Sequence, residues 1–164
     1  MEQGKGGKKQ LFRKCLAVLF LFYIVLLMYL LFFAEQYGRV PNGERAFRYN
    51  LIPFREICRF IRARKLLGMR VVLLNLLGNV AAFIPFGFFL PILSAGMRRM
   101  HRTAVSGFLL SLLVETVQLV SKTGAFDVDD IFLNTLGVVM GFTIFAAAGK
   151  KGSRIWQMKN DIIF

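Results

Sequence analysis

Acidic side chains inside and beside apolar segments are the residues of this sequence that could most readily carry out chemistry. Glu115 lies within the apolar run over residues 103–120. Asp127, Asp129 and Asp130 stand just before the next apolar run. A carboxylate in a membrane span costs about 2.5 to 3.5 kcal/mol on insertion scales, so it usually faces a bundle interior and marks a functional site. Such groups could exchange protons with a ligand or bind a hard cation.

Composition indicates that these carboxylates belong to a membrane protein. Of the 164 residues, 56% are hydrophobic, which exceeds the roughly 45 to 50% that is typical of soluble domains. The net charge is +13, but the basic residues lie between apolar segments rather than on one soluble module. We therefore expect this charge to set membrane topology and attract anionic lipid, and we expect no nucleic-acid partner.

Four apolar segments are each long enough to cross a hydrocarbon core of about 30 Å, which takes about 20 helical residues. They cover residues 15–34, 71–93, 103–120 and 131–148. The sequence therefore predicts an all-α, polytopic membrane protein with a single membrane domain over residues 15–149. A basic N-terminus (1–14) and a basic tail (150–164) flank this domain.

The distribution of basic residues predicts the orientation, because short cytoplasmic loops carry an excess of Lys and Arg. Five basic residues precede the first span, three lie in the loop over residues 95–102, and four follow the last span. We therefore expect both termini in the cytoplasm. Residues 35–70 carry nine basic residues and would lie outside, so the count favours this orientation over the inverted one by a small margin.

Residues 54–67 interleave apolar and basic side chains in the pattern of a helix that lies on a membrane surface. We expect this interfacial amphipathic helix on the extracytoplasmic side, between the first and second spans. Its contacts with the membrane surface would come from five basic side chains: Arg55, Arg59, Arg62, Arg64 and Lys65. A solvated connecting helix is the alternative interpretation.

Polar and small residues recur at helical spacing in the last three spans, so each span presents them on one face. The third span shows the pattern in Gly107, Ser111, Glu115 and Gln118, at steps of four, four and three. In the predicted orientation, the three faces meet in the outer half of the membrane. We expect an outward-open pocket formed by Asn75, Asn79, Glu115, Gln118, Asp127, Asp130 and Asn134.

Helix packing is the alternative explanation for several of these residues. Asn and Gln side chains hydrogen-bond across membrane helices, and a small-xxx-small pair such as Gly137 and Gly141 lets helices approach closely. The same two glycines could form a homodimer contact. Packing does not require carboxylates, however, so Glu115 and Asp130 carry the functional interpretation.

Four sequence blocks together resemble the VanZ-like family of membrane proteins. The blocks are NLIPFREI (50–57), NLLGNVAAFIPFGFFLP (75–91), ETVQ (115–118) and FDVDDIFLNTLG (126–137), in the family's order and spacing. The resemblance implies a small multi-span protein of the bacterial plasma membrane, in a family whose namesake is linked to teicoplanin resistance. Many members carry an arginine shortly before the aspartates, whereas this chain has Thr123, Gly124 and Ala125. The basic loop before the second span could replace that arginine.

Three functions are consistent with these observations. The first is a non-enzymatic protein of glycopeptide (teicoplanin) resistance, whose pocket and cationic helix act on membrane lipid, a lipid-linked cell-wall precursor or the lipoglycopeptide itself. The others are a membrane enzyme acting on a lipid or polyprenyl substrate and a carrier, with Glu115 and Asp130 as acid and base or as coupling groups. The sequence shows no nucleophile with its base and no standard calcium loop. We therefore expect no catalytic residues, no metal and no cofactor.

Overall fold

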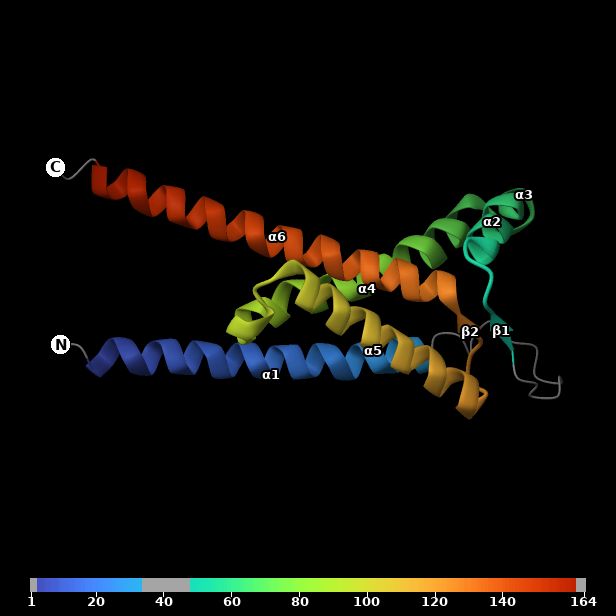
Figure 1. Cartoon of the computed structure of the whole chain (residues 1–164), viewed down its shortest axis with the longest axis horizontal. Coiled ribbons are helices and arrows are strands. Elements are labelled where there is room, and N and C mark those ends of the chain that lie inside the picture. Colours follow the sequence, from blue (N-terminus) through green and yellow to red (C-terminus); the bar gives the residue numbers. More distant parts are fainter. Residues whose placement is uncertain (1–2, 34–47, 162–164) are drawn as a thin grey trace.

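The computed structural model describes residues 3–33 and 48–161, which form a bundle of long helices (Figure 1). The long helices are α1 (Gln3–Phe33), α4 (Met69–Leu93), α5 (Met100–Ser121) and α6 (Val128–Asp161). The shorter elements are β1 (Tyr49–Asn50), α2 (Arg55–Arg62), α3 (Arg64–Leu67), the 3-10 helix η2 (Ala95–Met97) and β2 (Phe126–Asp127). The predicted all-α class is confirmed.

Four helical segments are long and apolar enough to cross a membrane. They are Gln10–Phe32, Met69–Leu93, Met100–Ser121 and Val128–Gly149. The four spans predicted from sequence are therefore confirmed as helices, although residue 34 of the first predicted span lies outside the described residues. Many large apolar side chains on these helices are exposed, as lipid-facing side chains of a multi-pass membrane protein should be.

Helices α4 and α6 approach closely because glycines lie in their contact. A methyl group added at Gly137 would overlap the carbonyl oxygen of Val80, and one added at Gly141 would overlap that of Ile84. The small-xxx-small pair thus packs against α4 within the same chain. The homodimer expected through these glycines stays a prediction, and it could not use this face while α4 occupies it.

Helix α1 is attached to the bundle through an aromatic and aliphatic core. The buried centre of this core consists of Leu27, Phe83, Phe86 and Val138. The hydroxyl of Tyr23 in α1 donates a 2.7 Å hydrogen bond to the carbonyl oxygen of Ala82 in α4. This bond satisfies a phenol in an apolar environment, where an unpaired hydroxyl would be costly.

A short two-stranded sheet lies at one end of the bundle. Strands β1 and β2 pair in parallel there, with Tyr49 opposite Phe126 and Asn50 opposite Asp127. The beginning of α1 and the end of α6 lie at the opposite end, at the left of Figure 1, whereas β1, β2, α2 and α3 gather at the right. This arrangement follows from four spans, because an even number returns the chain to its starting side.

The amphipathic segment predicted over residues 54–67 is helical, but it is divided into α2 and α3 at Ala63. Gly68, with a φ of 82°, separates α3 from α4. The five predicted surface residues of this segment, Arg55, Arg59, Arg62, Arg64 and Lys65, are all exposed. Its extracytoplasmic position on a membrane surface stays a prediction.

The native cysteines allow a direct test of orientation. Cys58 in α2 is unpaired and exposed, and His101 is exposed at the start of α5, beyond the short η2 turn. In intact cells, a membrane-impermeant maleimide should label Cys58 of a Cys15→Ser protein. A His101→Cys variant without either native cysteine should be labelled only after the cells are permeabilised. The reverse pattern would place α2 in the cytoplasm.

Candidate functional site

An open cavity of about 720 Å³ lies among the elements at the end of the bundle away from the termini. Its wall includes residues of β1, α2, α4, α5, β2 and α6. All seven pocket residues predicted from sequence line it: Asn75, Asn79, Glu115, Gln118, Asp127, Asp130 and Asn134. The structure therefore brings the complete predicted set to one cavity, and the binding of a ligand there stays a prediction.

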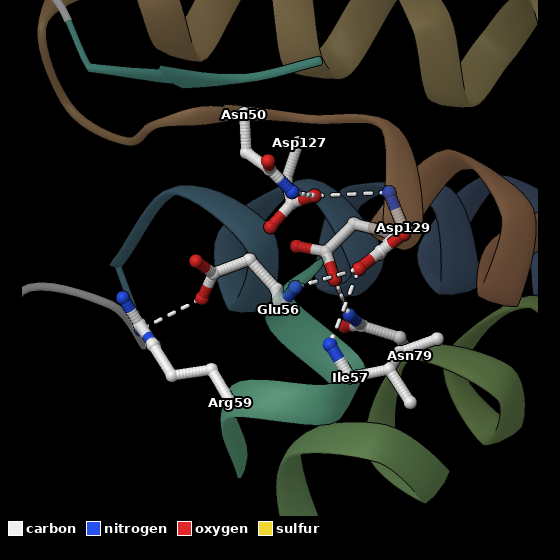
Figure 2. Close-up of polar contacts among 8 residues, drawn as sticks. Asn50, Glu56, Ile57, Arg59, Asn79, Asp127 and Asp129 are labelled. Atoms are coloured by element: carbon white, nitrogen blue, oxygen red, sulfur yellow. Dashed lines mark hydrogen bonds and ion pairs between the residues drawn. The ribbon is translucent and has the colours of Figure 1, made fainter. Parts of the chain in front are cut away.

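Asp127 connects β1 to the start of α6. Its Oδ1 accepts a 3.0 Å hydrogen bond from Nδ2 of Asn50, which the parallel strand register places opposite it. The same oxygen accepts a 2.9 Å bond from the backbone N–H of Asp129, as an N-cap side chain does (Figure 2). The Asp127 carboxylate thus caps the start of α6 and also bonds to β1.

Glu115 contacts the same segment from α5. Its Oε2 accepts a 2.9 Å hydrogen bond from the backbone N–H of Asp127, and its residue is only 3% exposed. The carboxylate in the third span therefore meets the chain where it enters the fourth. Its burial explains how a charged residue can stand in an apolar helix, since it faces the bundle rather than lipid.

Two further polar contacts join α4 and α5 to the first turns of α6. Nδ2 of Asn79 in α4 donates to Oδ1 of Asp130 in the first turn of α6. One helical turn further along α6, Nδ2 of Asn134 donates a 2.9 Å bond to Oγ of Ser111 in α5. The polar faces predicted on α4, α5 and α6 therefore do meet, at successive turns of α6.

The remaining two predicted residues bond elsewhere. Nε2 of Gln118 donates a 2.8 Å hydrogen bond to the carbonyl oxygen of Leu31, which attaches α5 to α1. Asn75 is exposed, and its Nδ2 donates to the carbonyl oxygen of Val71 one turn back in α4. Gln118 thus forms a hydrogen bond between helices, as expected if its role is helix packing. Asn75 lines the cavity but bonds only within its own helix.

Asp129 is a buried cavity residue that the predicted pocket omitted. Its carboxylate accepts hydrogen bonds from the backbone N–H groups of Glu56 at 2.9 Å and Ile57 at 3.2 Å (Figure 2). It also accepts one from the backbone N–H of Phe54, so all three donors lie at the start of α2. Helix α2 has no N-cap side chain of its own, because Phe54 occupies that position. The absence of Ser, Thr, Asp or Asn there is a sequence signal that could have indicated an acceptor from elsewhere in the chain.

Arginines surround the opening of the cavity. Arg48, Arg55 and Arg59 line it and are exposed. Arg59 forms a 2.7 Å ion pair with Glu56, and its guanidinium lies 5.5 Å from the ring centre of Phe60. The five basic residues predicted at the membrane surface thus divide into two groups. Arg55 and Arg59 face the cavity, whereas the other three lie outside its lining.

The environment of Asp127 shows how charge is balanced in the cavity. Burial raises the pKa of the Asp127 carboxyl above its usual value, and the hydrogen bonds from Asp129 and Asn50 lower it. The nearby Asp129 charge raises this pKa further, while Arg59 lowers it.

Within residues 3–33 and 48–161, no group of three or more His, Cys, Asp and Glu side chains could hold a metal ion.

Comparison with known proteins places the chain in a family. The family model described as VanZ/LLP1 matches residues 20–149, which include every cavity residue named above. Protein VanZ of Enterococcus faecium is 29% identical over 133 residues, covering 78% of this chain and 71% of that protein. No solved structure matches the chain. Since the family model spans most of its length, this four-span membrane protein belongs to the VanZ/LLP1 family.

Proposed function

We propose that this protein is a non-enzymatic plasma-membrane protein that protects the cell against teicoplanin. In this proposal, the cavity and the cationic segment α2–α3 bind a membrane lipid or a lipid-linked cell-wall precursor at the outer surface. Membership of the VanZ/LLP1 family supports the link to resistance. The observation that carries the proposal is that buried carboxylates and exposed arginines line one open cavity.

The composition of the cavity wall fits a lipid headgroup better than a small soluble molecule. Arginines at the opening would attract a phosphate, which they bind through paired N–H donors. Apolar side chains such as Leu30, Leu74 and Leu133 line the same cavity, and they would accept the first part of a hydrocarbon chain. A volume of about 720 Å³ lies within the roughly 300 to 1,000 Å³ of common ligand pockets.

The contacts of the carboxylates favour binding over catalysis. Asp127 and Asp129 accept backbone N–H groups that begin α6 and α2, so both carboxylates support local structure. Cys58 is absent from the cavity lining, and His101 lies at the start of α5, far along that helix from Glu115. A nucleophile and its base would have to be within hydrogen-bond reach of each other.

An enzyme or carrier that uses Glu115 and Asp130 is the second candidate, because Glu115 is buried and both residues line the cavity. Purified protein incubated with labelled lipid or polyprenyl precursors distinguishes an enzyme from a binding protein. A product that forms with the native chain and is lost in Glu115→Gln would support the enzyme. A carrier would instead show Glu115-dependent uptake in vesicles under a proton gradient.

Conservative changes at the two carboxylates test the proposed function. We expect Glu115→Gln and Asp130→Asn to weaken ligand binding about tenfold, because a hydrogen bond to a charged group contributes about 1.5 kcal/mol or more. Teicoplanin protection of a sensitive host should then fall toward that of cells without the protein. The measurement is the minimal inhibitory concentration of teicoplanin, with vancomycin tested alongside.

The matched control is Thr116→Ala, which changes an exposed residue of α5 next to Glu115. This variant should retain full protection. All variants should be present in the membrane in equal amounts by immunoblot. Unchanged teicoplanin protection in both carboxylate variants would contradict the role of the cavity.

A further inference from the structure

Among the residues that the structure describes, one buried side-chain acceptor in the cavity wall has no hydrogen-bond partner. Asn134 is 1% exposed and lines the cavity, and its Oδ1 is unpaired, whereas its Nδ2 donates to Ser111. The amide nitrogens of Asn50, Asn79 and Gln118 also have protein acceptors. A buried acceptor without a hydrogen-bond partner is unfavourable, so this position favours a ligand that brings a donor.

The surroundings of Asn134 select the kind of donor. Asp130 lies one helical turn before Asn134 on α6. Ser111, the partner of Asn134, lies one turn before Glu115 on α5. Asp130 and Glu115 line the same cavity as Asn134, so a donor that reaches Oδ1 enters a cavity that also contains carboxyl groups. A primary ammonium fits this environment, because it carries three N–H donors and a positive charge.

The opening of the cavity presents the opposite charge. Arg55 and Arg59 are four residues apart in α2, so both side chains lie on one face of that helix, and both line the cavity. Arg48 lies beside β1 and lines the cavity as well. A phosphate held among these guanidinium groups would stay near solvent while a cationic group joined to it enters the cavity.

We propose that the cavity recognises a zwitterionic headgroup in which a primary ammonium is joined to a phosphate. The ammonium donates to Oδ1 of Asn134, and the phosphate is bound by Arg55 and Arg59. This inference rests on the proposed function and names its ligand class, an aminophospholipid of the phosphoethanolamine type. Soluble phosphoethanolamine carries the same two groups and is the other source of this chemistry.

The test compares lipids that differ only in the headgroup. The full chain, purified in detergent, is titrated with short-chain phosphatidylethanolamine, phosphatidylcholine and phosphatidylglycerol of equal chain length, and binding is measured by native mass spectrometry. Phosphatidylethanolamine should bind about tenfold more tightly than phosphatidylcholine, whose trimethylated nitrogen has no N–H donor. Equal affinity for phosphatidylethanolamine and phosphatidylcholine, or for phosphatidylethanolamine and phosphatidylglycerol, would overturn the proposal.

Variants separate the two parts of the headgroup. Asn134→Leu should abolish the preference for phosphatidylethanolamine over phosphatidylcholine, whereas Asn134→Asp, which keeps an acceptor, should retain it. Arg55→Gln with Arg59→Gln should weaken both lipids equally, because both carry the phosphate. A preference that survives in Asn134→Leu would overturn the assignment of the ammonium. If Asn134→Leu does not fold, the comparison of lipids on the native chain decides.

Two further measurements separate the source and the function. Competition by soluble phosphoethanolamine at the lipid's own affinity would overturn the assignment to a lipid, whereas weaker competition would support it. If Glu115→Gln loses teicoplanin protection but the native chain shows no headgroup preference, this inference is overturned and the proposed function stands. A clear preference without any change in protection would support the headgroup site and contradict its role in resistance.

Discussion

Replacing Gly141 with alanine is expected to destabilise the bundle by about 3 kcal/mol, the upper range for overpacked cores. The new methyl group would overlap the carbonyl oxygen of Ile84 and lie 2.9 Å from the backbone nitrogen of Phe88. Both are backbone atoms of α4, so a rotation of a side chain cannot relieve the overlap. The measurement is the loss of folded protein with heating in detergent, or with added SDS.

Gly78→Ala is the matched control for this change. Gly78 lies in α4 as well, and a methyl group added there meets nothing within 4 Å. Alanine has a higher helix propensity than glycine by about 0.8 to 1.0 kcal/mol, so this variant should be as stable as the native protein or more stable. Equal unfolding of the Gly141→Ala and Gly78→Ala variants would show that α4 and α6 do not pack as described.

These glycines also show what helical spacing can and cannot predict. The four-residue step between Gly137 and Gly141 predicted that a helix could approach α6 closely, and the structure has such a contact. The spacing did not identify the partner, which is α4 of the same chain. A small-xxx-small pair describes one surface only, so the helix that packs against it depends on loop lengths and on the other faces of the bundle.

The seven cavity residues predicted from sequence could be found because each of them lies on a long helix or directly before one. In a helix, residues three or four apart share a face, so the positions of Asn79, Glu115 and Asp130 followed from their spacing. The number of spans then placed these positions at the same end of the bundle. No tertiary detail was needed for that step, since hydropathy and helix length define the spans.

Features that depend on short elements could not be predicted in this way. Strands β1 and β2 have two residues each, which is too short to produce an alternating pattern. Their pairing places Asn50 beside Asp127, and no local sequence signal indicates it. The division of the amphipathic segment at Ala63 is equally hidden, because the residues on both sides favour a helix.

Asp129→Ala is expected to release α2 from the cavity opening. The carboxylate accepts the N–H groups of Phe54, Glu56 and Ile57, and it is 3% exposed. Without it, three donors at the start of α2 lose their acceptor inside the protein. The loss of an N-cap costs about 0.5 to 2 kcal/mol, and hydrogen bonds to a charged group contribute more than neutral ones, so we expect a total near 2 to 3 kcal/mol.

Hydrogen exchange measured by mass spectrometry separates this local effect from general unfolding. Amide protons at the start of α2 should exchange faster in Asp129→Ala, while those in the middle of α4 and α5 keep their protection. Asp129→Asn retains one carbonyl oxygen as an acceptor and should show a smaller change. Unaltered exchange in α2 of Asp129→Ala would contradict the capping role. Since Arg55 and Arg59 are positioned by α2, the same variant should also weaken binding of a phosphate-bearing ligand even though Asp129 itself binds the backbone.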